Sequence, residues 1–188
     1  ETIPVILILG GSQGAQIINE IVMDALSNLV ERYQIIHQAG NRNVKEIEET
    51  TGIILEKSPY KNRYKVFGYL NDLALRMSSG AASLVISRAG STIFEIAAWA
   101  LPSIIIPIAD SNGDHQLKNA FNYARSGGCI VMEEKNLTPH VLISEIDKLM
   151  QNQAAREKMK KAASQFYKQD AALKIAREII NIAMKHEK

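Results

Sequence analysis

The stretch Pro4-Val-Ile-Leu-Ile-Leu-Gly-Gly-Ser-Gln-Gly-Ala15 decides the fold of this chain. Five apolar residues in a row, Val5 to Leu9, lead directly into Gly10 and Gly11, which is typical of a parallel strand with both faces buried. Beyond the glycines, apolar pairs recur from Ile17 to Val30 with the spacing of an amphipathic helix. The stretch therefore predicts a buried strand, a glycine-rich turn and a helix that packs on the sheet.

The rest of the chain repeats this alternation of short apolar runs and helical patterns. Further strands are expected at 34–37, 64–67, 83–86, 102–107 and 129–132, and helices at 44–50, 73–77, 92–99, 115–125, 139–149, 154–167 and 171–184. This order predicts an α/β fold, a Rossmann-like parallel sheet with helices on both faces. With no linker or repeat, residues 1–188 read as one domain.

Composition excludes several classes of protein. The chain has 188 residues, of which 46% are hydrophobic and 22% charged, so it is neither disordered nor low in complexity. Cys129 is the single cysteine, so no intrachain disulfide can form. A net charge of +2 is too balanced to indicate a nucleic-acid surface. The most apolar stretch, 93–109, carries Glu95 and two prolines and does not read as a membrane span.

The first candidate site is the glycine-rich loop Gly10 to Ala15. Its glycines would let the backbone approach a phosphate, and the following helix would offer unpaired N–H groups. The loop matches neither G-x-G-x-x-G nor a P-loop, so a tight turn without a ligand stays an alternative. Its letters also fit G-x-S-x-G, with Ser12 as an esterase nucleophile. That site would need a histidine in a loop after a later strand, and His140 falls within a predicted helix.

Two further loops follow strands that would end at the same edge of the sheet. The segment 87–95 ends at Glu95, whose apolar neighbours require a polar partner, and a ribose diol would suit it. The alternative is a capping box, in which Glu95 reaches back to the backbone N–H of Thr92. The segment 110–116 offers acceptors and donors for sugar hydroxyls, although Asp114 can also simply cap a helix. The histidines and Cys129 form no metal-spaced cluster.

Four motifs together resemble the MurG family of bacterial glycosyltransferases, which move N-acetylglucosamine from UDP onto lipid I to form lipid II in peptidoglycan synthesis. They are Gly10-Gly-Ser-Gln-Gly-Ala15 with Asn19, Phe67-Gly-Tyr-Leu-Asn-Asp72, Ser87-Arg-Ala-Gly-Ser-Thr92 with Glu95, and Asp114-His-Gln116 with Asn119. The resemblance covers nearly the whole chain, in order, and only the C-terminal half of the family.

The resemblance implies one half of a GT-B enzyme, in which two Rossmann-like domains face a cleft and the C-terminal one binds UDP-N-acetylglucosamine. No metal or other cofactor is implied. The acceptor site for lipid I, the catalytic base and the membrane-associating patch belong to the family's N-terminal domain, which has no counterpart here. The isolated chain, which begins without Met, is therefore expected to be inactive, and its last helices (about 154–188) are candidates to pack on that domain. The whole enzyme would act in the bacterial cytoplasm, peripherally on the cytoplasmic face of the cell membrane.

The resemblance also implies roles for single residues. Ser12 and the amides of Gly11, Gln13 and Gly14 should meet the diphosphate, and Leu70 should present its backbone to uracil. Gly14→Val is therefore expected to weaken UDP binding more than folding.

A second set of residues should contact the phosphates, the ribose and the sugar. Glu95 should bind the ribose hydroxyls, and some family members carry Gln at the position of His115. Arg88 matches the motif but is interpreted as structural. The residues implied to line the diphosphate and hold the sugar are Ala89, Gly90, Ser91, Thr92, His115 and Gln116.

Other functions stay open at this point. A UDP-sugar 2-epimerase has a similar fold, and a non-catalytic nucleotide-sugar binding subunit would need the same loops. A nicotinamide-binding domain is disfavoured because the third glycine of its fingerprint is missing and no acidic residue closes the strand near Ile36.

Overall fold

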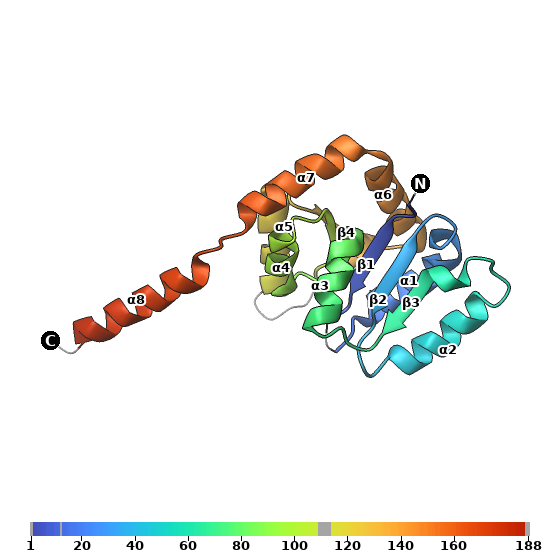
Figure 1. Cartoon of the computed structure of the whole chain (residues 1–188), viewed down its shortest axis with the longest axis horizontal. Helices are drawn as coiled ribbons and strands as arrows, with labels where there is room; N and C mark the ends of the chain where they lie inside the picture. The colour runs from blue at the N-terminus through green and yellow to red at the C-terminus, as the bar shows by residue number, and fades with distance from the viewer. Residues whose placement is uncertain (1, 12, 109–113, 187–188) are drawn as a thin grey trace.

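A computed structural model describes residues 2–11, 13–108 and 114–186 (Figure 1). Its centre is a six-stranded sheet in the order β3-β2-β1-β4-β5-β6, with every pairing parallel. The strands are β1 Val5–Leu9, β2 Gln34–Gln38, β3 Tyr64–Phe67, β4 Ala82–Ser87, β5 Ser103–Ile105 and β6 Ile130–Val131. This is the Rossmann strand order, so the predicted α/β fold is confirmed.

Helices cover both faces of the sheet (Figure 1). They are α1 Gln16–Leu29, α2 Val44–Ile54, α3 Asp72–Ala81, α4 Thr92–Ala98, α5 His115–Arg125, α6 Pro139–Gln151, α7 Gln153–Phe166 and α8 Ala171–His186, with short 3₁₀ turns η1 Lys61–Arg63 and η3 Glu134–Asn136. Each helix expected from the sequence is present, and α2 and α3 run several residues further than predicted.

Strand β1 divides the core into two layers because its side chains alternate between the faces of the sheet. Ile6 and Ile8 belong to the cluster that includes residues of α1 and α6. Leu7 and Leu9 belong to the cluster that includes residues of α4 and α5. All four side chains are at most 4% exposed. The continuous apolar run at the start of the chain is thus explained by burial on both faces.

Two helix starts form as their sequences predict. The Asn71 side chain accepts a hydrogen bond from the backbone N of Ala74 at 2.9 Å and caps α3. Thr138 Oγ1 accepts from the backbone N of Val141 at 3.3 Å, and Pro139 occupies the first position of α6. Such caps satisfy backbone N–H groups that have no partner within the helix.

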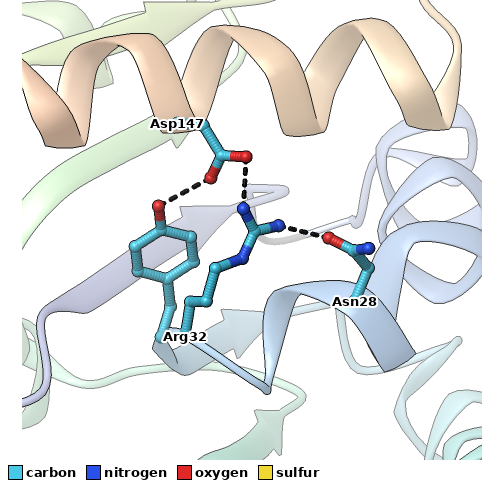
Figure 2. Close-up of polar contacts among 4 residues, drawn as sticks. Asn28, Arg32 and Asp147 are labelled. Atoms are coloured by element: carbon cyan, nitrogen blue, oxygen red, sulfur yellow. Dashed lines mark hydrogen bonds and ion pairs between the residues drawn. The ribbon is translucent and has the colours of Figure 1, made fainter.

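A polar cluster joins the end of α1 to α6, far from each other in sequence (Figure 2). Arg32 donates to the carboxylate of Asp147 and to the side-chain oxygen of Asn28. The hydroxyl of Tyr33 donates to the second carboxylate oxygen of Asp147 at 2.7 Å. Desolvation, followed by the neighbouring Asp147, raises the pKa of this tyrosine. These contacts hold α6 in place next to the apolar cluster that it forms with α1 and β1.

Helix α8 extends away from the rest of the molecule (Figure 1). Every side chain described in it, from 171 to 184, is exposed, including Ile175, Ile179 and Ile182 on one face. Within the described part of the chain, no helix combines the length and the apolar character needed to cross a bilayer.

Candidate functional site

The sheet order places the candidate site. Strands β1 and β4 are neighbours, while the chain continues from β1 to β2 on one side and from β4 to β5 on the other. At such a switch point the loops that follow the two strands diverge and leave a crevice at the carboxyl edge of the sheet. The loops after β1 and β4 are the ones that carry the glycine-rich segment and the segment 88–91.

A hollow of about 320 Å³ opens at this edge. Five residues that the sequence singled out line it together: Gly11, Leu70, Ser91, Thr92 and Glu95. They come from the segments that follow β1, β3 and β4: Gly11, Leu70 and Ser91 precede the helices, and Thr92 and Glu95 lie in the first turn of α4. The other lining residues are Leu9, Gln38, Tyr69, Asp72 and Leu75. None of the residues lining the hollow has a positively charged side chain, so an anion there would depend on backbone N–H groups and on neutral donors such as the hydroxyls of Ser91 and Thr92.

The glycine loop is held tightly against the end of β2. The backbone N of Gly10 donates to the carbonyl of Gln38 at 2.9 Å. Gly14 has a φ of +80°, and a Cβ built on it would lie 2.3 Å from the carbonyl oxygen of Ala39. Gly11 also has a positive φ, +77°, but a Cβ there would meet nothing within 4 Å. Gly14 is therefore required by packing, whereas Gly11 faces open space. Ser12 lies outside the described residues.

A buried polar network supports this loop from behind. His37 Nε2 lies 3.0 Å from Asn19 Oδ1, and His37 Nδ1 lies 2.9 Å from the hydroxyl of Tyr64. Asn19 in turn donates from Nδ2 to the carbonyl of Ala39 at 3.1 Å. His37 is fully buried, and this burial lowers its pKa from 6.5 to about 4. The imidazole is thus neutral at pH 7 and bridges β2, β3 and α1.

Glu95 is exposed, and its carboxylate makes no hydrogen bond or ion pair with the described residues. The capping-box interpretation is wrong, because Ser91 is the N-cap of α4, Thr92 is its first residue, and no side chain caps the helix. Partial burial, and secondarily the nearby carboxylate of Asp72, raises the pKa of Glu95. A carboxylate without a partner, at the rim of the hollow, is free to accept from a ligand.

Leu70 lines the hollow with its main chain, because its side chain is buried. Its side chain is 4% exposed, and its backbone N donates to Gln38 Oε1 at 3.2 Å. Its carbonyl accepts no hydrogen bond among the described residues.

The start of the loop after β4 is structural. Ala89 is fully buried, and its carbonyl accepts from Asn119 Nδ2 at 3.1 Å. Arg88 forms an ion pair with Glu134 at 2.6 Å and donates to the carbonyl of Ile106 at 3.2 Å, which supports its interpretation as a structural residue. Gly90 is half-buried, and a Cβ there would meet nothing within 4 Å.

His115 and Gln116 begin α5 and do not line the hollow. Gln116 Oε1 accepts from the backbone N of Ile108 at 3.1 Å, so it ties α5 to the chain beyond β5. His115 is exposed. Asp114 occupies the N-cap position with a φ of +55° but makes no side-chain cap hydrogen bond. The preceding residues, 109–113, lie outside the described ranges, and the sugar-binding interpretation of this loop stays a prediction.

Sequence reasoning does not identify Gln38, Tyr69 and Asp72 as lining residues. Gln38 is the last residue of β2, one place beyond the predicted end of that strand. Tyr69 and Asp72 flank Leu70 within the motif 67–72, in which the family resemblance implies a role for Leu70 alone. Position at a strand's carboxyl end is the available signal for Gln38.

The hollow at the carboxyl edge is not the largest on the molecule. One of about 530 Å³ lies at the opposite edge of the sheet, against Pro4, Ala82 and Arg156. It contains none of the candidate residues and lies at the amino ends of the strands, away from the edge where open α/β sheets bind ligands. Across the described ranges, no group of three or more His, Cys, Asp or Glu side chains could hold a metal ion.

Known proteins with similar sequences and structures include bacterial transferases. The chain is 36% identical over 188 residues to the UDP-N-acetylglucosamine–N-acetylmuramyl-(pentapeptide) pyrophosphoryl-undecaprenol N-acetylglucosamine transferase of Clostridium kluyveri, covering 98% of this chain and 48% of that protein. The crystal structure of Acinetobacter baumannii MurG superposes with a TM-score of 0.80 at 28% identity, over 96% of this chain and 50% of that one.

A protein of Listeria monocytogenes assigned as a UDP-N-acetylglucosamine 2-epimerase shares the fold alone, with a TM-score of 0.68 at 16% identity over 97% of this chain and 46% of that one. The chain spans about half the length of the curated relatives it matches. The model of the glycosyltransferase family 28 C-terminal domain matches residues 5–175. Taken with the carboxyl-edge hollow and the Rossmann sheet, this match shows that the chain belongs to the glycosyltransferase family 28 C-terminal domain family.

Proposed function

We propose that this chain is the donor-binding part of an N-acetylglucosaminyltransferase and that its ligand is UDP-N-acetylglucosamine. The observation that carries the proposal is the hollow at the switch point, where residues from three loops, predicted from sequence to bind one ligand, lie together. The relatives that carry a transferase name support the same ligand.

The diphosphate would lie over the start of α1. This helix has 14 residues and no acidic side chain in its first turn, so its free N–H groups and dipole favour an anion. Gly11 offers backbone beside open space, and the Gly14 N–H donates to the Gly11 carbonyl at 3.2 Å and so closes the turn. Because no lining side chain is positively charged, the phosphates would be recognised by main-chain N–H groups and by the hydroxyls of Ser91 and Thr92.

The nucleoside would lie between the loops after β3 and β4. Glu95 would accept hydrogen bonds from both ribose hydroxyls, since the structure gives its carboxylate no other partner among the described residues. The unpaired carbonyl of Leu70 would accept from the base. Ser91, Thr92 and the backbone at Gly90 would face the phosphates and the sugar.

The chain itself would not perform the transfer. N–H groups of the glycine loop and of α1 would stabilise the negative charge that develops on the leaving UDP. The acceptor and the catalytic base would come from the part of the relatives that this chain does not span, and attack from that side would invert the anomeric centre to give a β linkage. His115 and Gln116 would hold sugar hydroxyls.

Helix α8 is proposed to pack on that same part of the protein. Its apolar residues Ile175, Ile179 and Ile182 lie on one face and are 50–62% exposed, so the helix has no partner within the described part of this chain. The relatives act on a pyrophosphoryl-undecaprenol compound, a lipid. We therefore place the whole enzyme at the cytoplasmic face of the bacterial membrane, in peripheral contact with it.

Calorimetry tests the proposal directly. We expect UDP and UDP-N-acetylglucosamine to bind the purified chain and NAD not to bind. Binding of NAD without UDP would contradict the proposal. Addition of lipid I should give no product with this chain alone, and turnover would show that the missing half is unnecessary. An epimerase would instead interconvert the donor with its 2-epimer, which nuclear magnetic resonance of the sugar detects.

A further inference from the structure

Gln38 joins the two loops that would hold opposite ends of the nucleotide. Its backbone carbonyl accepts from Gly10 N at 2.9 Å, at the start of the glycine loop. Its side-chain Oε1 accepts from Leu70 N at 3.2 Å, in the loop after β3. One residue of β2 therefore sets the spacing between the phosphate side and the base side of the hollow.

The orientation of the Gln38 amide is fixed by this contact. A backbone N–H can only be met by an acceptor, so the oxygen faces Leu70 and the NH₂ group faces the other way. That NH₂ group makes no hydrogen bond with the described residues and is not among their buried unsatisfied atoms. Gln38 lines the hollow, so these unpaired amide donors are close enough for a ligand there to accept from them.

The contact also determines what Leu70 can offer. Since its N–H is held by Gln38, the group of its main chain left without a partner among the described residues is the carbonyl oxygen. A carbonyl binds a base that carries a ring N–H. Uracil has such an N–H, flanked by two carbonyl oxygens that can accept from an amide donor. Cytosine has an acceptor at that ring position and an amino group beside it, and so would meet both protein groups with the wrong polarity.

We propose that Gln38 is a positioning residue that sets the Leu70 main chain and thereby selects a uracil base over cytosine, an inference that rests on the proposed binding of a UDP-linked sugar. Gln38 is 6% exposed, and its neighbours in register are Leu9 on β1 and Phe67 on β3. The amide is thus held in the sheet and not on a loose loop, which gives the base site a fixed geometry before ligand arrives.

The test compares UDP and CDP on the parent chain and on three variants. The parent should prefer UDP by about 10- to 100-fold, the effect of mispairing one or two buried hydrogen bonds. Gln38→Met removes the acceptor and the donor at nearly constant volume, and Gln38→Asn keeps an amide too short to reach Leu70. Both should reduce the preference to about one. Gln38→Glu keeps an oxygen for Leu70 N–H but has no amide donor. It should retain the part of the preference that depends on the Leu70 carbonyl, while binding both nucleotides more weakly because its charge repels the diphosphate.

A role of Gln38 in folding alone would lower the melting temperature and leave the UDP-to-CDP ratio unchanged, and that result would overturn the inference. If the Met variant does not fold, the Asn variant decides. Loss of the preference in the Glu variant as well would also contradict it, because the acceptor would then be irrelevant. A parent chain that binds neither nucleotide would instead refute the proposed function, so the two failures are distinguishable.

Discussion

Gly14 lies against Ala39, so closely that a Cβ on Gly14 would be 2.3 Å from the Ala39 carbonyl oxygen and 2.2 Å from Asn43 Nδ2. The glycine loop is therefore packed against the turn after β2 on one side and is open on the other, at Gly11. This arrangement changes the expectation that a side chain at Gly14 acts mainly on UDP binding. The added atoms would collide with the protein itself before they reached a ligand.

Gly14→Ala should destabilise the fold by about 2 to 4 kcal/mol, from left-handed strain together with overpacking. Gly11→Ala should cost only the strain, about 1 to 2 kcal/mol, because its Cβ meets nothing. Urea unfolding measures both. Equal losses of unfolding free energy in the two variants would show that the loop is not packed as described.

Gly90→Ala is the sharper test of ligand approach. The new Cβ has open space and no positive φ, so the unfolding free energy should change by less than about 0.5 kcal/mol, while UDP affinity should fall because the methyl group occupies space beside the backbone. Gly52→Ala is the matched control, on α2 away from the hollow, with equally open space. UDP affinity that is unchanged in both variants would remove Gly90 from the proposed site.

Glu95→Gln separates ribose binding from helix stability. Since Glu95 caps nothing, the variant should lose only the interaction of its charge with the N-terminus of α4, about 0.3 to 1 kcal/mol of unfolding free energy. Loss of charge-assisted hydrogen bonds should weaken UDP binding by about 10- to 100-fold. The parent should bind 2′-deoxy-UDP more weakly than UDP, and the variant should scarcely distinguish them. Equal discrimination by both chains would exclude the ribose contact.

UDP binding should also depend on pH, because Glu95 must be ionised to bind the ribose and Asp72 helps to raise its pKa. Because partial burial and then Asp72 raise the pKa of Glu95, its carboxylate becomes neutral at a higher pH than an ordinary glutamate, and UDP affinity should fall as the pH falls through that raised pKa. Asp72→Asn removes one of the two causes and should move the loss of affinity to lower pH. Calorimetric titrations between pH 4 and 7 check this, and an unshifted profile would show that the two carboxylates do not interact.

His37 makes a separate prediction about stability. Its pKa is about 4 in the folded chain and 6.5 when exposed, so the unfolded state binds more protons between these values. The contribution of the neutral His37 to the free energy of unfolding is thus fully present above pH 6.5 and is lost as the pH falls toward 4. From pH 7 to pH 4.5 the loss from this group is about 2 to 3 kcal/mol. In His37→Gln, unfolding free energies at the two pH values should differ by that much less than in the parent.

The strand β1 is predictable from sequence because Val5–Leu9 is a continuous apolar run closed by glycine. The other strands are shorter runs with an apolar centre, and they are predictable because they alternate regularly with helical patterns. Loops at the carboxyl ends of such strands share one edge by topology, so the sequence alone is enough to group Gly11 with Glu95. Leu70 joins this group only through the family resemblance. The fit of Gly14 against Ala39, and the bond from Leu70 N to Gln38, depend on how two loops pack across β2. No local pattern carries that information, which is why the sequence does not single out Gln38. The sequence also allows a capping box at Thr92, because the pattern of Thr92 and Glu95 does not show which residue begins the helix.

The exposure of α8 should make its backbone amides exchange rapidly with solvent. Isolated helices of fewer than about 12 to 15 residues are marginal in water, and α8, with 16, lies barely above this limit and has no tertiary support from the described residues. Its amide hydrogens should therefore exchange with deuterated solvent far faster than those of α1, which is packed on the sheet. When a chain with the part of the relatives that this one does not span is added, slowed exchange along 171–186 would report the proposed packing of α8 on that part without any need for catalysis.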